Sequence, residues 1–192
     1  KTNRTGKIDQ AAELSRLTKM FYIFGSNIEF QGGHYGNAIL SRFPVVKKNN
    51  LLLPNLNSGE QRGVLESVIK LSENQNISFL ATHLDHRKPD NERIASAKFI
   101  NKKISLSNNT PAILAGDFND IPISLTLKEF GKLWLHTNTT LSPTIPVSKP
   151  TRQIDYIMIR PKKSWRVIRS KVLDEAVASD HRAIFAEIEL VK

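Results

Sequence analysis

The sequence predicts an α+β fold, in which sheets are covered by helices. Two observations predict it: most strand-like segments are followed by another strand-like segment, and helical segments occur singly between them. No Gly/Ser linker, low-complexity tract or internal repeat interrupts the chain. Residues 1–192 are therefore expected to form one domain, in keeping with the chain length.

The first half of the chain contains one predicted helix and four predicted strands. The helix spans Ile8–Lys19, where the apolar residues form one partial face. In the last two of the four strands, apolar residues alternate imperfectly with polar ones, which predicts that these strands are half-buried. The four strands are expected at Phe21–Phe24, Asn37–Ser41, Val64–Leu71 and Ile77–Thr82.

The second half contains two predicted helices and the remaining strands. One helix is predicted over Asn91–Leu106, with Asp90 or Asn91 as its N-cap, and a shorter one over Ser124–Leu133. Prolines predict a loop over Leu141–Arg152. Strands are expected at Ala112–Ala115, Ile154–Ile159 and Ala183–Leu190, with Trp165–Leu173 as a weaker strand.

Composition excludes several classes of protein. Hydrophobic residues make up 40% and charged residues 24% of the chain, which excludes a disordered or collagen-like protein. No run approaches the roughly 18–20 apolar residues that span a bilayer. The absence of cysteine excludes disulfides, thiolate metal sites and a cysteine nucleophile, and it leaves the cellular location open.

The net charge of +10 favours anionic partners, which include nucleic acid, phosphorylated small molecules and acidic membrane surfaces. One stretch concentrates basic residues without an intervening acid. We interpret it first as a solvated edge strand and second as an anion-binding surface. Its basic residues are Arg160, Lys162, Lys163, Arg166, Arg169 and Lys171.

Polar clusters fall where the predicted strands begin or end. They are Thr82–Asp85, Gly116–Asn119, Gln153–Tyr156 and Ser179–His181. Strand ends project side chains into a common rim, where binding sites are often built. Histidines, carboxylates and amides that converge there suit metal-assisted hydrolysis with Mg²⁺ or Mn²⁺.

At these positions the sequence resembles the endonuclease/exonuclease/phosphatase superfamily. The family's order is kept by the motifs YGNAILSRFP, ATHLDH, ILAGDFND, QIDYIMI and ASDH. The pair Asp9-Gln10 and the loop Gly32–Asn37 match the bacterial branch of that family. The resemblance implies a four-layer α/β-β/α sandwich, with two mainly antiparallel sheets inside and helices outside.

The resemblance also implies roles for individual residues. Asp117 matches the aspartate that orients or deprotonates the attacking water, and Asn119 matches the asparagine that contacts phosphate or holds the nucleophile. His181 matches the histidine that faces the scissile phosphate, and Asp155 the aspartate that sets its tautomer. Asp180 matches a frequent metal ligand.

Further site residues come from the same comparison. His83 matches a second phosphate-facing histidine, and Glu60 or Gln61 is expected to support it. Asn37 and Arg62 are expected to bind substrate. Substrate choice is expected in two variable loops, 49–60 and 136–152.

One departure from the family pattern is visible at the start of the chain. Family members carry their principal metal ligand, a glutamate in a Gln-Glu pair, ahead of the region that matches Lys1–Gln10, and Lys1–Lys7 holds no carboxylate. We therefore expect an N-terminally truncated domain that lacks its first strand or strands. With Asp180 as its only plausible carboxylate ligand, this chain is expected to bind Mg²⁺ weakly and to be nearly inactive.

Each assignment has a structural alternative. Asp117 could be a turn residue, and the pair Asp180-His181 could cap a helix or strand. Asp155 could pair with a nearby arginine, and Asn37 could only shape its loop. His83 could be an ordinary core histidine.

The sequence thus predicts a monomeric, Mg²⁺- or Mn²⁺-dependent phosphoesterase that hydrolyses a phosphodiester by in-line attack of water. Nucleic acid, a phospholipid headgroup and a small phosphodiester remain open as substrates. One alternative is a basic binding module for nucleic acid or an anionic membrane, although bare carboxylates at its rim would repel phosphate. The other is an inactive fragment of the enzyme.

Overall fold

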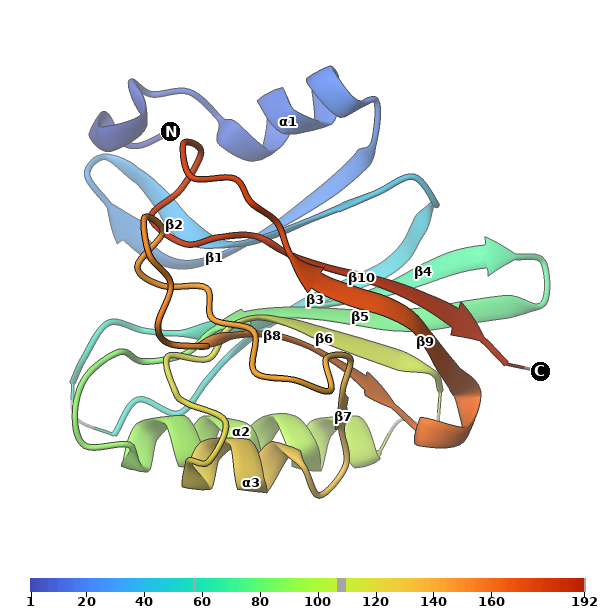
Figure 1. The fold of residues 1–192 in the computed structure, drawn as a ribbon. Coiled ribbons are helices and arrows are strands. Elements are labelled where there is room, and N and C mark those ends of the chain that lie inside the picture. Colours follow the sequence, from blue (N-terminus) through green and yellow to red (C-terminus); the bar gives the residue numbers. More distant parts are fainter. Residues whose placement is uncertain (57, 107–109, 192) are drawn as a thin grey trace.

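The computed structural model describes residues 1–56, 58–106 and 110–191, which form four layers (Figure 1). Helix α1 (Gln10–Thr18) covers the first of two hairpins that form the next layer, a six-stranded sheet follows, and α2 and α3 cover its other face. The predicted α+β sandwich is therefore confirmed. The hairpins are β1–β2 (Phe21–Phe30, Gly33–Ser41) and β9–β10 (Trp165–Val172, Ile184–Leu190).

The hairpin layer differs from the expected second sheet. Within the described ranges, β1–β2 and β9–β10 form separate two-stranded ladders, because each strand pairs with its nearest neighbour along the chain. Both hairpins pack on the same face of the six-stranded sheet. Ile23 and Ile39 of the first contact Leu65, whereas Trp165 and Ile188 of the second lie against the cluster around Ile159.

The six-stranded sheet has the order β3-β4-β5-β6-β8-β7. Strands β5 and β6 run parallel, and α2 forms the crossover between them, whereas the other described pairs are antiparallel. The strands are β3 (Val45–Leu52), β4 (Gly63–Ser72), β5 (Gln75–His83), β6 (Ala112–Asp117), β7 (Leu135–His136) and β8 (Asp155–Arg160).

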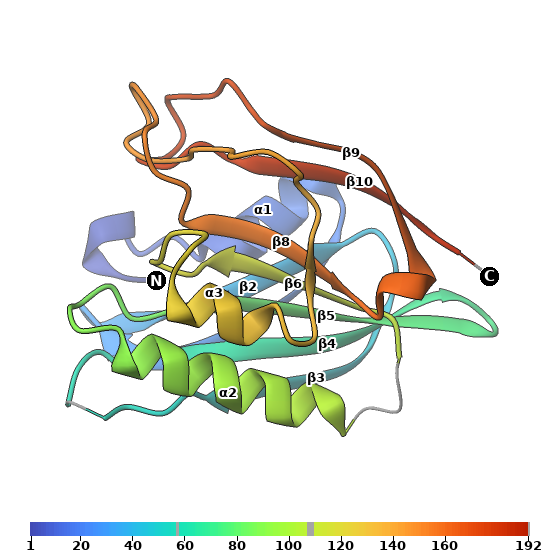
Figure 2. The same ribbon diagram turned by 60° about the horizontal axis from the view of Figure 1, so that its bottom comes forward.

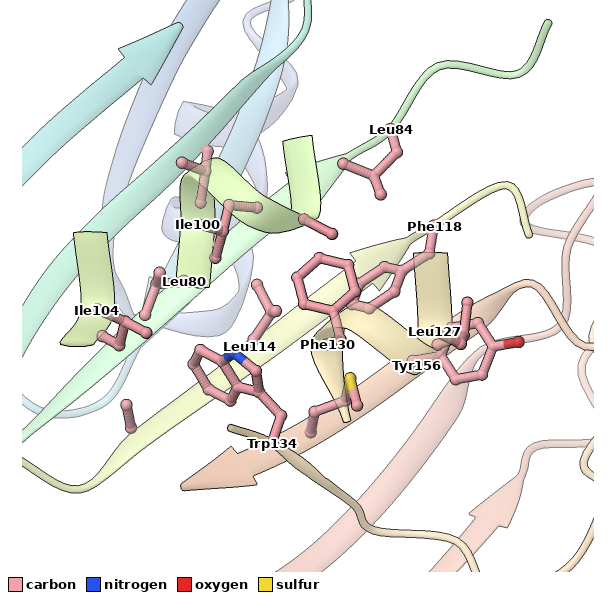
Figure 3. Close-up of a cluster of buried hydrophobic side chains, with 14 of the residues drawn as sticks. Leu80, Leu84, Ile100, Ile104, Leu114, Phe118, Leu127, Phe130, Trp134 and Tyr156 are labelled. Carbon is pink, nitrogen blue, oxygen red and sulfur yellow. The ribbon is translucent and has the colours of Figure 1, made fainter. Parts of the chain in front are cut away.

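The main core lies between this sheet and the helices α2 (Asn91–Ser105) and α3 (Leu125–Phe130), which lie side by side beneath it (Figure 2). Figure 3 shows Leu80 and Leu114 of the sheet pointing toward Ile100, Phe130 and Trp134. Because this face of the sheet is filled by apolar side chains, polar groups of the same strands can gather only on the opposite face or at the strand ends.

Most predicted elements are present, and two strands were missed. The range Val45–Leu52 forms an exposed edge strand, and its run of adjacent lysines and asparagines hides the alternation expected of a strand. The prediction of a loop over 49–60 was therefore wrong for residues 49–52. Strand β7 has only two residues, too few to show a period. Strands β4 and β5 alternate between buried and partly buried residues, as the sequence predicts. Their partly buried residues are nevertheless covered, because helices lie over one face and the β1–β2 hairpin over the other.

The basic stretch forms part of the exposed strand β9, as its first interpretation predicts. Arg166 and Arg169 pair across the hairpin with Glu189 and Glu187, so part of its charge is neutralised by carboxylates of β10. Arg160 is buried and donates to the carbonyl of Ile104. Within the described residues, no helix has the length and apolar character needed to cross a membrane.

Candidate active site

Three adjacent strands place a row of titratable side chains at one edge of the sheet. His83 of β5 is the register partner of Asp117 of β6, and Asp117 is the register partner of Asp155 of β8. Along β6 and β8, residues four positions away, Ile113 and Ile159, face the hairpin layer. Because side chains alternate along a strand, the row faces the same layer.

The turn that presents Asp117 depends on its neighbours. Gly116 has φ +152°, and a Cβ there would lie 1.8 Å from the carbonyl oxygen of Thr82, so the two strands approach too closely for a side chain. Phe118 is fully buried, with its ring centroid 4.8 Å from that of Phe130 and 5.1 Å from that of Tyr156. The buried ring anchors the turn, and Asp117 on its other side remains at the rim.

Asn119 closes the same turn with a left-handed backbone conformation at φ 51°. Its main-chain N–H donates to Asp117 Oδ1 at 2.8 Å, and its side-chain amide donates to the carbonyl of Leu84 at 2.9 Å. Asn119 therefore holds both the carboxylate and the segment that follows His83. Its predicted contact with phosphate stays a prediction.

The predicted contact between His181 and Asp155 is present. The loop before β10 brings His181 Nδ1 to 2.9 Å from Asp155 Oδ2, and Thr144 donates its hydroxyl to the same oxygen. A carboxylate only accepts hydrogen bonds, so Nδ1 of His181 carries the proton and Nε2 is left for the site. Asp155 Oδ2 thus binds His181 and Thr144, and not an arginine, as the structural alternative for Asp155 had it.

His83 lies between Asp117 and a residue that the sequence analysis did not single out. Its Nε2 is 3.5 Å from Asp117 Oδ2, and its Nδ1 is 3.3 Å from the hydroxyl oxygen of Tyr35. The expected support from Glu60 or Gln61 takes another form. Glu60 pairs with Arg62, and Gln61 donates to the carbonyls of Leu53 and Arg62.

Arg62 lies near enough to this row for its charge to lower the pKa of both His83 and Asp117, and its side chain is only 5% exposed. Its Nη2 contacts Nδ1 of His86, and its Nη1 lies 2.9 Å from Glu60 Oε1 without hydrogen-bond geometry. Asn37 donates to the carbonyl of Gly63 at 2.9 Å, next to Arg62. Asn37 thus holds the backbone beside the arginine, and substrate contact by either residue stays a prediction.

The electrostatics of the site follow from burial and crowding of charge. Burial raises the pKa of Asp117 to about 6; the N–H of Asn119 lowers it, Asp155 raises it, and His181 and Arg62 lower it. Burial, together with the electrostatic influence of Arg62 and of the neighbouring His181 and His86 rings, lowers the pKa of His83 to about 4. Near neutral pH the site therefore holds an ionised Asp117 beside a neutral His83.

The donor set of the site fits a divalent cation. Ligand atoms of Asp117, Asp155 and His181 lie within 4.8 Å of one another. The carboxylate oxygens of Asp117 and Asp155 suit Mg²⁺ or Mn²⁺, although Nδ1 of His181 is already bonded to Asp155. A cation there would lower the pKa of Asp117, which burial and, less strongly, the charge of Asp155 raise. Asp180, the ligand that the resemblance implies, is exposed and accepts from Ser179, so its metal role stays a prediction.

The high pKa of Asp117 gives a first prediction. In metal-free protein with ¹³C-labelled aspartate, we expect the Asp117 carboxyl to titrate at about pH 6. Excess Mg²⁺ is expected to lower that midpoint, because a bound cation favours the carboxylate. Asp117→Asn identifies the resonance by its loss. A midpoint near the ordinary 3.8 without metal would contradict the burial of Asp117 and its repulsion by Asp155 as the causes of a raised pKa.

The arrangement is that of a phosphate-ester hydrolase: a sandwich of sheets whose strand ends gather carboxylates and histidines at one rim. The chain belongs to the Endonuclease/Exonuclease/phosphatase family, whose model matches residues 5–181. Members of this family hydrolyse phosphate esters and typically depend on divalent metal ions.

The individual proteins that this chain resembles have low sequence identity to it. YbhP of Escherichia coli K12 is 26% identical over 190 residues, which cover 88% of this chain and 68% of that protein. The mannosyl-6-phosphatase Bt3783 of Bacteroides thetaiotaomicron superposes with a TM-score of 0.81 at 22% identity, covering 94% of this chain and 81% of that one. The human Nocturnin catalytic domain with bound sulfate gives 0.78 at 18% identity, with 96% and 77% covered. At these identities the two structures show a shared fold.

Two residues of the site were missed by sequence reasoning. Thr144 lies in the predicted proline loop, and nothing in the sequence connects it with Asp155. Tyr35 was visible within the Gly-Gly-His-Tyr-Gly-Asn loop, but its partner His83 is 48 residues away. A hydroxyl can reach such a site only when the hairpin packs on the sheet.

Proposed function

We propose that this protein is a Mg²⁺- or Mn²⁺-dependent hydrolase of phosphodiesters that acts by in-line attack of water. The observation that carries the proposal is the cluster of Asp117, Asp155 and His181, with Arg62 near it. Carboxylates that face an anionic substrate require a compensating cation, and a metal site supplies one.

Each residue of the row has a chemical task in this proposal. Asp117, ionised near neutral pH, accepts the proton of the attacking water while the N–H of Asn119 holds its other oxygen. His181, held through Nδ1 by Asp155, places Nε2 toward the phosphate. His83 and Arg62 contribute donors to the oxygens on which charge develops. The divalent ion, when bound, would polarise a phosphoryl oxygen.

The charge of the chain supports an extended or strongly anionic substrate. A net charge of +10 raises the local concentration of polyanions near the rim, which is an advantage for nucleic acid over a neutral ester. A second candidate is a phosphomonoesterase. It is supported by the structural similarity to a mannosyl-6-phosphatase, a name that describes that protein alone.

The decisive experiment compares an activated phosphodiester, bis(p-nitrophenyl) phosphate, with the monoester p-nitrophenyl phosphate. We expect slow release of nitrophenol from the diester, and only in an excess of Mg²⁺ or Mn²⁺ that compensates for the weak metal binding expected of this chain. Turnover should be lost in chelator and recovered when metal is restored. Faster hydrolysis of the monoester would favour the second candidate. Tight, steeply salt-dependent DNA binding that persists in chelator, without turnover in metal, would instead indicate a binding module.

A further inference from the structure

The two histidines of the site have different partners on the same ring nitrogen. Nδ1 of His181 faces a carboxylate oxygen of Asp155 at 2.9 Å, whereas Nδ1 of His83 faces the hydroxyl of Tyr35 at 3.3 Å. A carboxylate can only accept, but a hydroxyl can donate or accept. The tautomer of His83 therefore depends on whether the Tyr35 hydroxyl donates a hydrogen bond to Nδ1 or accepts one from it.

The position of the Tyr35 ring is fixed by packing against other aromatic rings. It lies on β2, with its ring centroid 6.1 Å from that of Phe30 and 6.5 Å from the ring of His83 in an edge-on arrangement at 65°. These ring contacts do not need the hydroxyl. Removing only the hydroxyl therefore leaves the packing of Tyr35 in place.

The other nitrogen of His83 settles the direction of the hydrogen bond. Nε2 lies 3.5 Å from Asp117 Oδ2. If Nδ1 carried the proton, the lone pair of Nε2 would face an ionised carboxylate, which is repulsive. If Nε2 carries it, N–H faces the carboxylate and Nδ1 accepts from Tyr35, so both contacts are favourable.

We propose that Tyr35 is a positioning residue that donates its hydroxyl proton to Nδ1 of His83 and thereby holds His83 as the Nε2–H tautomer. His83 then offers a neutral N–H donor beside Asp117, where a phosphate oxygen would lie. His181 has the opposite tautomer, because Asp155 draws the proton to Nδ1. The site thus presents Nε2 of His83 as a donor, and Nε2 of His181 as an acceptor that becomes a donor to phosphate when the ring takes up a second proton.

The first test measures the tautomers directly and needs no activity. Long-range ¹H–¹⁵N spectra of protein with ¹⁵N-labelled histidine distinguish a protonated ring nitrogen from a bare one. We expect Nε2–H for His83 and Nδ1–H for His181 near neutral pH. In Tyr35→Phe, the His83 signals are expected to shift toward a mixture of tautomers, while those of His181 stay unchanged. His83→Ala assigns the resonances.

Tyr22→Phe is the matched control, because it removes a hydroxyl from an exposed tyrosine at the other end of the β1–β2 hairpin. It should leave the tautomer of His83 unchanged. An Nδ1–H tautomer of His83 in the unmodified protein would overturn the proposal. So would a Tyr35→Phe variant whose His83 signals match those of the unmodified protein.

The catalytic consequence rests on the proposed function and is tested separately. With bis(p-nitrophenyl) phosphate, Tyr35→Phe is expected to lower kcat about five- to tenfold with little change in KM, the size of one lost hydrogen bond. In a His83→Ala background the same change should have no further effect. An equal loss in both backgrounds would contradict action through His83. Absence of turnover in every form, with the expected tautomers, would refute only the proposed function.

Discussion

Asp117→Asn is expected to lower kcat for an activated phosphodiester by about 10²- to 10⁴-fold, the usual range for loss of a general base. Asparagine keeps the shape of the side chain and can still accept from the N–H of Asn119, but it cannot take a proton from water. The effect should therefore fall on kcat rather than on KM. Initial rates over a series of substrate and metal concentrations measure both.

Glu73→Gln is the matched control for this change. It makes the same carboxylate-to-amide replacement in a side chain that is 88% exposed, at the turn between β4 and β5, far along β5 from His83. Its turnover should equal that of the unmodified protein. Near-normal turnover by Asp117→Asn would refute the assigned role of Asp117.

The sign of the pKa shift predicts that Asp117→Asn does not destabilise the fold, and a denaturation measurement checks this. The carboxyl of Asp117 has a pKa of about 6 in the folded chain, above its ordinary value of 3.8. Between these values the unfolded chain has released the proton and the folded chain still binds it, so stability falls as pH rises from about 4 to about 6. An asparagine side chain does not titrate, so the variant does not lose stability in this way. The variant should be more stable by about 1–3 kcal/mol above about pH 6, and this gain should vanish below about pH 4.

The second large effect is expected for His181→Ala, which should lower kcat by about 10²- to 10³-fold. The change removes the Nε2 that faces the phosphate and leaves the carboxylate of Asp155 without the ring that it orients. Added imidazole should restore part of the activity, because a free ring can enter the space that the side chain leaves. Rates with and without imidazole measure this recovery.

Asp155→Asn provides a graded comparison for His181. An amide nitrogen in place of Oδ2 can donate to Nδ1 and so favours the wrong tautomer, whereas an amide oxygen there keeps the hydrogen bonds from both Thr144 and His181. We expect a smaller loss than for His181→Ala, with no rescue by imidazole. Full activity of His181→Ala with a retained fold would show that the ring has no part in the reaction.

Much of the fold could be predicted from local patterns. The helix at Asn91–Ser105 and the strand at Ala112–Asp117 have periods and ends that the sequence displays within a few residues. The edge strand Val45–Leu52 could not be predicted, because it is exposed and no apolar alternation marks it. The sequence predicts the alternating burial of β4 and β5, but it does not show which hairpin and which helix cover their two faces, because those lie in other parts of the chain.

The sequence by itself determined the chemical groups of the site and their places at strand ends, because Gly116, Asp117 and Asn119 form one local turn whose geometry depends on adjacent residues. Only the tertiary structure decided which groups meet. Strand register aligned His83, Asp117 and Asp155, and packing of the β1–β2 hairpin brought Tyr35 to His83. Register and packing depend on residues far apart in the sequence, because apolar faces of distant segments are buried together. No local sequence pattern therefore predicts the side-chain contacts that result.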